Sequence, residues 1–296
     1  MIHKTVLLNE AIENLNLKPG KIYFDGTLGN AGHAEKVCSL FNSEIKVVAV
    51  DRDIDAINNA KDKLSKLGCD YYVILSDYRK MDVVFDNLGI KKVDAILFDL
   101  GLSSDQLELS GRGFSFKRDK PLLMTFSNEG NERVTAEKIL NDWSEETIAD
   151  ILYGYSDERY ARRIAKAIVM ARQKKEIKTT FDLVEIIKNT VPKSYQTGKI
   201  NPANKTFQAL RIAVNDEIGA VKEGMEKGWE FLNKSGRMAV ISFHSVEDRE
   251  VKNFFRDKAK NHLGNLTNKK PITATEEEIK ENPRSRSAKL RIAEKN

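Results

Sequence analysis

The sequence has few cysteines and no long apolar run. Its two cysteines, Cys38 and Cys69, lie in neither a CxxC nor a zinc-type spacing, so we expect no structural metal and no disulfide framework. No stretch approaches the roughly 18 uninterrupted apolar residues of a membrane-spanning helix. The opening residues lack the charged-then-apolar pattern of a signal peptide. We therefore expect a reduced, soluble protein of the cytoplasm.

Charge of one sign is not abundant either. The 296 residues contain 49 Lys and Arg against 44 Asp and Glu, a net charge of +5. This mild excess is compatible with RNA binding but does not indicate it, because RNA binding depends on how the positive charges cluster on the surface. The clearest basic cluster runs from Arg284 to Arg291. The length is sufficient for one large core, or for one core and a smaller insert.

The first hundred residues alternate between strand-like and helix-like patterns. Short apolar runs predict strands at Ile22–Phe24, Val47–Val50, Tyr71–Leu75 and Val93–Phe98. The segments between them predict helices at Gly32–Leu40, Asp53–Leu67 and Met81–Leu88. Buried strands separated by helices indicate βαβ units and a Rossmann-like, mostly parallel sheet.

The pattern becomes wholly helical from about residue 135 to 199. Helices are predicted at Ala136–Trp143, Glu145–Tyr153, Glu158–Arg172 and Thr180–Thr190, with Ser144, Asp157 and Thr179 as caps. One long helix over 202–232, a strand at Arg237–Phe243 and a helix at Val246–Lys260 follow. A hairpin of Leu266–Thr273 with Lys289–Ala293 gives an antiparallel end. We predict an open α/β core over 1–130 and 206–296, interrupted by an all-α insert over 131–205.

A glycine-rich turn follows the first predicted strand, in the segment YFDGTLGNAGH at 23–33. Its glycine spacing matches neither the dinucleotide fingerprint nor a P-loop, which favours a cofactor without a pyrophosphate. Asp51 ends the second strand, where a carboxylate can accept hydrogen bonds from ribose hydroxyls or can simply cap the next helix. Tyr78, after the third strand, lies beside the adenine or is a core aromatic. Together these elements favour S-adenosylmethionine.

The fourth strand ends at Asp99, within ILFDLGLSSDQ at 96–106. An exocyclic cytosine amine is a poor nucleophile, so its methylation needs an acceptor near the amine N–H. Asp99 can be that acceptor or can orient the cofactor. Methylation at cytosine C5 needs a nucleophilic cysteine, and neither cysteine ends a strand, so we reject it. His244, in ISFHSVEDR at 241–249, is either a catalytic or a structural histidine.

Several long motifs resemble those of a known family, the ribosomal RNA small subunit methyltransferase H family of MraW-like 16S rRNA (cytosine-N4)-methyltransferases. The motifs are HKTVLLNEAI (3–12), DGTLGNAGH (25–33), DLGLSSDQL (99–107), GRGFSF (111–116), FQALRIAVNDE (207–217), SFHSVEDR (242–249) and NPRSRSAKLR (282–291). The resemblance implies a class I S-adenosylmethionine-dependent methyltransferase fold with a helical substrate-recognition insert. It also implies N4-methylation of a cytidine in the decoding region of 16S rRNA, with the small ribosomal subunit as partner.

Carried over position by position, the resemblance also implies a set of cofactor contacts. They are Ala31, Gly32, His33, Asp51, Tyr78, Asp99 and Gln106. The sequence departs from the family pattern at Leu123 and Thr125, where an acid and an arginine are usual, and at Ala31, where glycine is usual. The first departure motivates an alternative, a catalytically impaired RNA- or ribosome-binding relative of the family.

Bound RNA would present its target base unstacked, with cations on phosphates and aromatics on unpaired bases. We expect substrate contacts from Arg112, Phe114, Arg211, Arg284, Arg286 and Arg291. Arg162 and Arg163 are further candidates, although with Lys166 and Arg172 they also fit an ordinary solvated helix face. Arg211 lies among apolar residues and can instead be a buried structural charge. The segment 99–102, DLGL, is not the motif of DNA amino-methyltransferases, and the insert argues against a small-molecule substrate.

Overall fold

The structure is a computed structural model that describes residues 4–101, 110–126, 134–197 and 201–296. The chain divides into two compact units, which we describe separately. The first unit comprises residues 1–101 and 218–296, and the second comprises 102–217. The second unit is thus wider than the insert that the sequence predicts at 131–205, whose role in substrate recognition stays a prediction.

Seven strands of the first unit form one sheet in the order β3-β2-β1-β4-β5-β7-β6. They are β1 (Ile22–Asp25), β2 (Lys46–Asp51), β3 (Asp70–Leu75), β4 (Val93–Asp99), β5 (Leu232–Ser242), β6 (Gly264–Leu266) and β7 (Lys289–Lys295). Strands β1 to β5 are parallel, and β7 runs antiparallel to β5 and β6. The predicted Rossmann-like sheet with an antiparallel end is confirmed.

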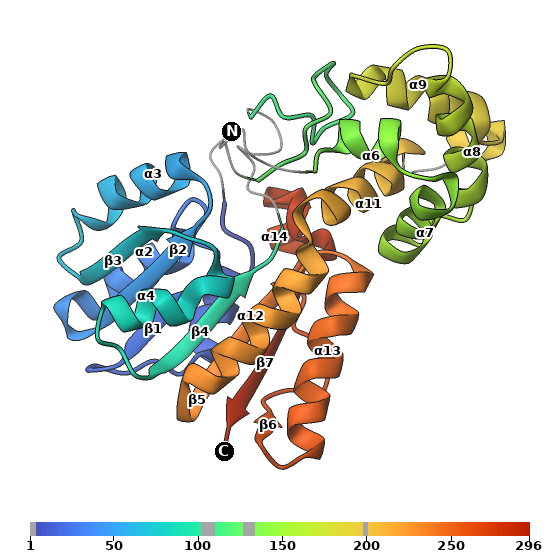
Figure 1. The fold of residues 1–296 in the computed structure, drawn as a ribbon. Coiled ribbons are helices and arrows are strands. Elements are labelled where there is room, and N and C mark those ends of the chain that lie inside the picture. The colour runs from blue at the N-terminus through green and yellow to red at the C-terminus, as the bar shows by residue number, and fades with distance from the viewer. Residues whose placement is uncertain (1–3, 102–109, 127–133, 198–200) are drawn as a thin grey trace. The chain divides into compact units, whose positions relative to one another are not determined.

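Helices cover both faces of this sheet (Figure 1). They are α1 (Leu8–Asn14), α2 (Gly32–Phe41), α3 (Ile54–Leu64), α4 (Met81–Asn87), α12 (Glu217–Phe231), α13 (Ser245–Lys260) and α14 (Glu276–Glu281). Alternate strand residues enter two cores, because successive side chains of a strand point to opposite faces. Tyr23 and Leu97 pack with α1, α2 and α3, whereas Phe24 and Phe98 pack with α4, α12 and α13.

The antiparallel hairpin is shorter than predicted. Strand β6 covers only Gly264–Leu266 and pairs with the far end of β7. Beyond it, within the predicted strand at Leu266–Thr273, a single bridge joins Ile272 to Leu290. The segment between contains Asn268 and a Lys-Lys-Pro run, and a proline supplies no N–H for strand pairing.

The described part of the second unit is helical, with its own core. Its helices are α6 (Ala136–Asp142), α7 (Glu145–Ser156), α8 (Ala161–Arg172), α9 (Thr180–Thr190), α10 (Lys193–Gln196) and α11 (Ala203–Asn215). Ser144 and Thr179 cap α7 and α9 as predicted. The prediction for Asp157 was wrong, because it ends α7 in the left-handed conformation, at φ 51°, instead of starting α8. Asp tolerates that conformation better than most residues.

The single helix predicted over 202–232 is two helices. Asp216 adopts the left-handed conformation, with φ 48° and ψ 44°, and separates α11 from α12. The apolar periodicity does not reveal this break, because both helices bury apolar faces. Neither helix, nor any other in the described ranges, is both long and apolar enough to cross a lipid bilayer.

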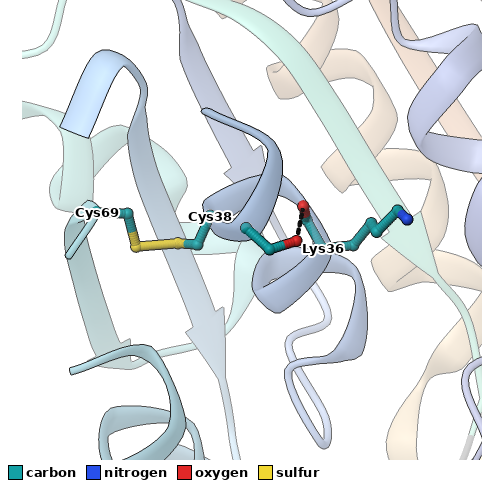
Figure 2. The surroundings of a disulfide bond; sticks show 4 residues. Lys36, Cys38 and Cys69 are labelled. Atoms are coloured by element: carbon teal, nitrogen blue, oxygen red, sulfur yellow. Dashed lines mark hydrogen bonds between the residues drawn. A yellow bond between two sulfur atoms is a disulfide. The ribbon is translucent and has the colours of Figure 1, made fainter. Parts of the chain in front are cut away.

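The expectation of no disulfide was wrong. Cys38, on α2, and Cys69, just before β3, form a disulfide with their Cα atoms 5.3 Å apart (Figure 2). Their sequence separation of 31 residues is not a recognisable motif spacing. The fold brings them together, because the parallel pairing of β2 with β3 lays the start of β3 beside the helix that precedes β2.

Candidate active site

Three carboxylates end neighbouring parallel strands of the first unit. Asp25 ends β1, Asp51 ends β2 and Asp99 ends β4. Burial raises the pKa of Asp25 to about 7 and is also the main cause of the raised pKa values of Asp51 and Asp99. Clustered acids with perturbed pKa values at the carboxyl edge of a parallel sheet are characteristic of a functional site.

The glycine-rich turn between β1 and α2 lies at this edge. A Cβ atom at Gly26 would lie 2.3 Å from Phe98, and one at Gly32 would lie 1.8 Å from the Thr5 hydroxyl, so both positions need glycine. Ala31 is the N-cap of α2 with φ 63°, a left-handed conformation that usually favours glycine. Alanine in place of the usual glycine at position 31 therefore introduces backbone strain.

Asp51 ties the turn to β2. Its Oδ2 accepts a hydrogen bond from the Gly29 N–H at 2.8 Å, and its Oδ1 accepts one from the Asp53 N–H at 2.9 Å. The cap of α3 is Asp53, whose side chain accepts from the Asp55 N–H, so Asp51 is not the helix cap. A carboxylate has about four lone-pair sites, so Asp51 retains capacity for ribose hydroxyls.

Tyr78 borders the same turn. Its ring packs against Phe98 with centroids 5.1 Å apart, and its Cβ lies 3.2 Å from the place of a Cβ on Gly26. The Tyr78 side chain is half-buried and packs against the core. The core role of Tyr78 is thus confirmed, and its contact with adenine stays a prediction.

Asp99 is held by its backbone and has one free carboxylate oxygen. Its N–H donates to the Thr27 hydroxyl at 2.5 Å, and its Oδ2 lies 3.9 Å from Nδ1 of the buried His33. Oδ1 is buried and has no hydrogen-bond partner among the described residues. A buried acceptor without a partner is unfavourable, so this oxygen is suited to accept a hydrogen bond from a ligand.

Asp25 and Tyr23 belong to the site, although the sequence analysis did not single them out. The Tyr23 hydroxyl donates to Asp25 Oδ2 at 3.2 Å, and the Thr27 N–H donates to Asp25 Oδ1 at 3.1 Å. Thr27 therefore joins Asp25 to the backbone of Asp99. The rule that selected Asp51 and Asp99, an acid at the end of a strand, would also have found Asp25.

His244 caps α13. Its Nδ1 accepts from the Glu247 N–H at 3.3 Å, and its Nε2 lies 3.2 Å from Glu247 Oε1. Glu247 is buried and also accepts from the Phe243 N–H. These contacts give His244 a structural role, and its catalytic role stays a prediction.

The RNA candidates of the second unit make internal contacts. Arg112 is buried and donates to the Phe126 carbonyl at 2.6 Å, with its guanidinium 5.6 Å from the Phe114 ring centroid. Phe114 is only 6% exposed and belongs to the helical core. Arg211 forms two 2.8 Å hydrogen bonds with Glu217, as the buried-charge alternative expects. None of these side chains presents a free face for stacking, so their RNA roles stay predictions.

The C-terminal candidates differ in exposure. Arg291, on β7, pairs with Asp248 at 2.7 Å. Arg286 is exposed and Arg284 is half-buried. Gln106, a predicted cofactor contact, lies outside the described residues. The sequence thus selected exposed and ion-paired arginines alike, because burial and pairing depend on the tertiary fold.

Leu123 and Thr125 lie in a well-bonded segment of the second unit. Asn215 accepts from the Phe126 N–H and donates to the Met124 carbonyl. The Met124 N–H donates to Arg112, and Leu123 accepts from the Ala136 N–H. The backbone of this segment is therefore fixed without the acid and the arginine that are usual there.

The whole chain, residues 1–296, matches the model of the family described as the MraW methylase family. The chain belongs to this family. Among its curated relatives is the ribosomal RNA small subunit methyltransferase H of Brevibacillus brevis, 42% identical over 99% of this chain and 98% of the relative. The enzyme of that name from Acetivibrio thermocellus is 43% identical over the same shares.

Family membership and the class I fold confirm the predictions of a methyltransferase and of S-adenosylmethionine as its cofactor. The residues present fit this group. The turn is closed to any side chain at Gly26 and Gly32, Asp51 has spare acceptor capacity, and Asp99 Oδ1 is an unpaired acceptor. The individual cofactor contacts stay predictions.

Proposed function

We propose that the protein methylates the N4 amine of a cytidine in the decoding region of 16S rRNA within the small ribosomal subunit. The name shared by its relatives, ribosomal RNA small subunit methyltransferase H, supports the class of substrate. The observation that carries the chemistry is Asp99, whose buried Oδ1 lacks a hydrogen-bond partner among the described residues.

The amine of cytosine needs an acceptor because its lone pair is delocalised into the ring. A carboxylate that accepts one amine N–H aligns the nitrogen with the methyl group and stabilises positive charge that develops during transfer. Thr27 fixes the backbone of Asp99, so this acceptor is held before the base arrives. S-adenosylmethionine, when bound, supplies the methyl group on a positively charged sulfur.

The charge state of Asp99 follows from its surroundings. Burial raises its pKa well above the usual value, and Asp25 and Glu247 raise it further. A positive charge nearby lowers the pKa of a carboxyl group. Asp99 therefore becomes ionised, and able to accept, when the cationic cofactor lies beside it.

The alternative of a catalytically impaired relative rests on Leu123 and Thr125. The backbone hydrogen bonds of residues 121–126 support the enzyme reading, because the segment keeps a defined conformation without the two missing charges.

The test uses small subunits from cells that lack the family enzyme. The purified protein is incubated with them and methyl-labelled S-adenosylmethionine, and the RNA is digested to nucleosides. We expect label in N4-methylcytidine, formed about 10³-fold more slowly with Asp99→Asn. Label in another nucleoside, or no label despite cofactor binding measured by calorimetry, would overturn the proposal.

A further inference from the structure

A cluster of two tyrosines and two arginines lies on the second unit. The Arg159 guanidinium lies 4.9 Å from the ring centroid of Tyr160 and 4.7 Å from that of Tyr195. The two rings are 4.9 Å apart in an edge-to-face arrangement, and Arg163 lies 5.8 Å from Tyr160. We call these four residues the tyrosine platform. Its arginines are exposed and its tyrosines half-buried.

A buried carboxylate, that of Glu158, forms hydrogen bonds with both tyrosines of the platform. Glu158 is fully buried; its Oε1 accepts from the Tyr160 N–H and its Oε2 from the Tyr195 hydroxyl, both at 2.8 Å. Burial, and then Glu158, raise the pKa of Tyr195 to about 12, so its hydroxyl stays protonated and continues to donate. The Tyr195 ring and the backbone of Tyr160 are therefore positioned before any ligand binds, which lowers the entropic cost of binding.

The platform continues into a face of one charge sign. Arg162, Arg163 and Lys166 are exposed and share one side of α8, opposite the buried Ile164 and Ile168, and the exposed Arg159 lies just before the helix begins. Arg163 also donates to the Thr190 carbonyl at 2.8 Å. Helix α8 contains no acidic residue. None of the four cations has a carboxylate at ion-pair distance in the described part of the chain.

An ordinary solvated helix face mixes both signs, because opposite charges four residues apart stabilise a helix. Here the cations gather toward the N-terminal end of α8, where the helix dipole does not stabilise them. The arrangement is thus unfavourable for the free helix. Negative charge from another molecule would make it more favourable.

We propose that the tyrosine platform and the cationic face of α8 bind an unpaired stretch of RNA. The inference rests on the proposed function and names the surface that holds the substrate. Guanidinium planes and tyrosine rings stack on unpaired bases, whereas bases in a duplex are already stacked on one another. The outer N–H groups of the arginines and Lys166 contact the phosphates.

The test measures binding of the full chain to a 12-nucleotide single-stranded RNA and to the same sequence in a duplex. Arg159→Ala and Tyr160→Leu should each weaken binding of the single strand about tenfold, since stacking on one aromatic is worth this much or more. Arg159→Lys keeps the positive charge but loses the planar guanidinium group. Its affinity for the single strand should lie between those of the wild type and Arg159→Ala. Lys174→Ala removes an exposed cation just beyond α8 and should change affinity less than twofold.

Three results would overturn the proposal. One is an equal loss for Arg159→Ala and Lys174→Ala, which would indicate general charge attraction. Another is an equal loss for duplex and single strand. The third is displacement of the RNA by an acidic peptide at equal charge, which would indicate a protein partner. Thermal unfolding of each variant identifies any that fails to fold, and Arg159, as an exposed residue, gives a variant that folds.

This test can fail separately from the proposed function. Direct RNA binding does not need methyl transfer, so the platform can be confirmed even if no methylcytidine forms. With small subunits as substrate, Arg159→Ala should raise KM about tenfold while kcat and the affinity for S-adenosylmethionine stay unchanged. A fall in kcat alone would place Arg159 outside the binding surface.

Discussion

The two units place their charges in opposite ways. The sheet unit holds acids in its interior, at the ends of β1, β2 and β4, where burial raises their pKa values. The helical unit places cations on the outside of α8, where water and salt surround them. The acids are thus few and have raised pKa values, whereas the cations are clustered and exposed.

This difference matches two physical tasks. Alignment of a reacting group needs fixed acceptors in a dry site, because hydrogen bonds there are strong and directional. Capture of a polyanion needs exposed cations, whose attraction acts at a distance and weakens with salt. Four substitutions test whether the two units are divided in this way.

The largest effect is expected from Asp99→Asn, which removes the negative charge of the unpaired acceptor and leaves an amide oxygen in its place. The change should lower kcat for methyl transfer about 10³-fold. The variant should be at least as stable as the wild type, because burial raises the pKa of Asp99 and disfavours its charge. The matched control is Asp94→Asn on the same strand, because Asp94 bonds to Ile22 and Lys21 away from the site. Similar kinetic losses for both variants would break the assignment of the chemistry to the sheet edge.

The second test is the pH dependence of Asp25→Asn. Burial raises the pKa of Asp25 from its ordinary value of 3.8 to about 7 in the folded state. The folded state therefore binds more protons between these two pH values, and wild-type stability falls as pH rises. The variant lacks this loss. Its advantage in unfolding free energy should grow between pH 4 and pH 7 to at most about 4 kcal/mol. Denaturant titrations at pH 4.5 and pH 8 measure this difference. The same difference in unfolding free energy between variant and wild type at both pH values would contradict the prediction.

The third test concerns the disulfide, since both cysteines of the chain lie in the sheet unit. Cys69→Ser should lower the unfolding free energy by about 3 kcal/mol under oxidising conditions, because the bond closes a loop of 31 residues. Wild type and variant should become nearly equal in reductant. A loss that persists in reductant would show that the serine itself disturbs packing between α2 and β3.

The smallest effect is expected from Arg211→Ala, on the helical unit. Arg211 is 19% exposed and bonds twice to the buried Glu217, so its loss should cost about 2 kcal/mol of stability. Affinity for single-stranded RNA, corrected for the folded fraction, should not change. A loss of RNA affinity at unchanged stability would instead make Arg211 a substrate contact and weaken the contrast between units.

Local patterns predicted most of the fold. Strand β2 and helix α9 were found within one residue of their bounds, because apolar spacing and caps such as Thr179 act over a few residues. The break at Asp216 was missed, since left-handed backbone leaves no mark on apolar periodicity. The disulfide was missed because it depends on the packing of α2 against the start of β3.

The sequence predicted those site residues whose position follows from neighbouring residues, and it missed those placed by contacts between distant segments. Asp51 and Asp99 were selected because each ends a strand, a feature visible in the sequence. Phe114 was expected to face RNA and is buried, since the helical core that covers it is assembled from distant segments. The ring of Tyr195 meets Arg159 across 36 residues, and no spacing rule anticipates that contact.

The insertion of the helical unit between β4 and β5 also sets an order in time. The ribosome makes β4 and then all of 102–217 before β5, the strand that pairs with β4. At the usual rate of synthesis this interval lasts roughly ten seconds. Throughout it, the edge of β4 and the apolar face meant for α12 and α13 lack their coverings, so the nascent chain is most prone to aggregate in this window.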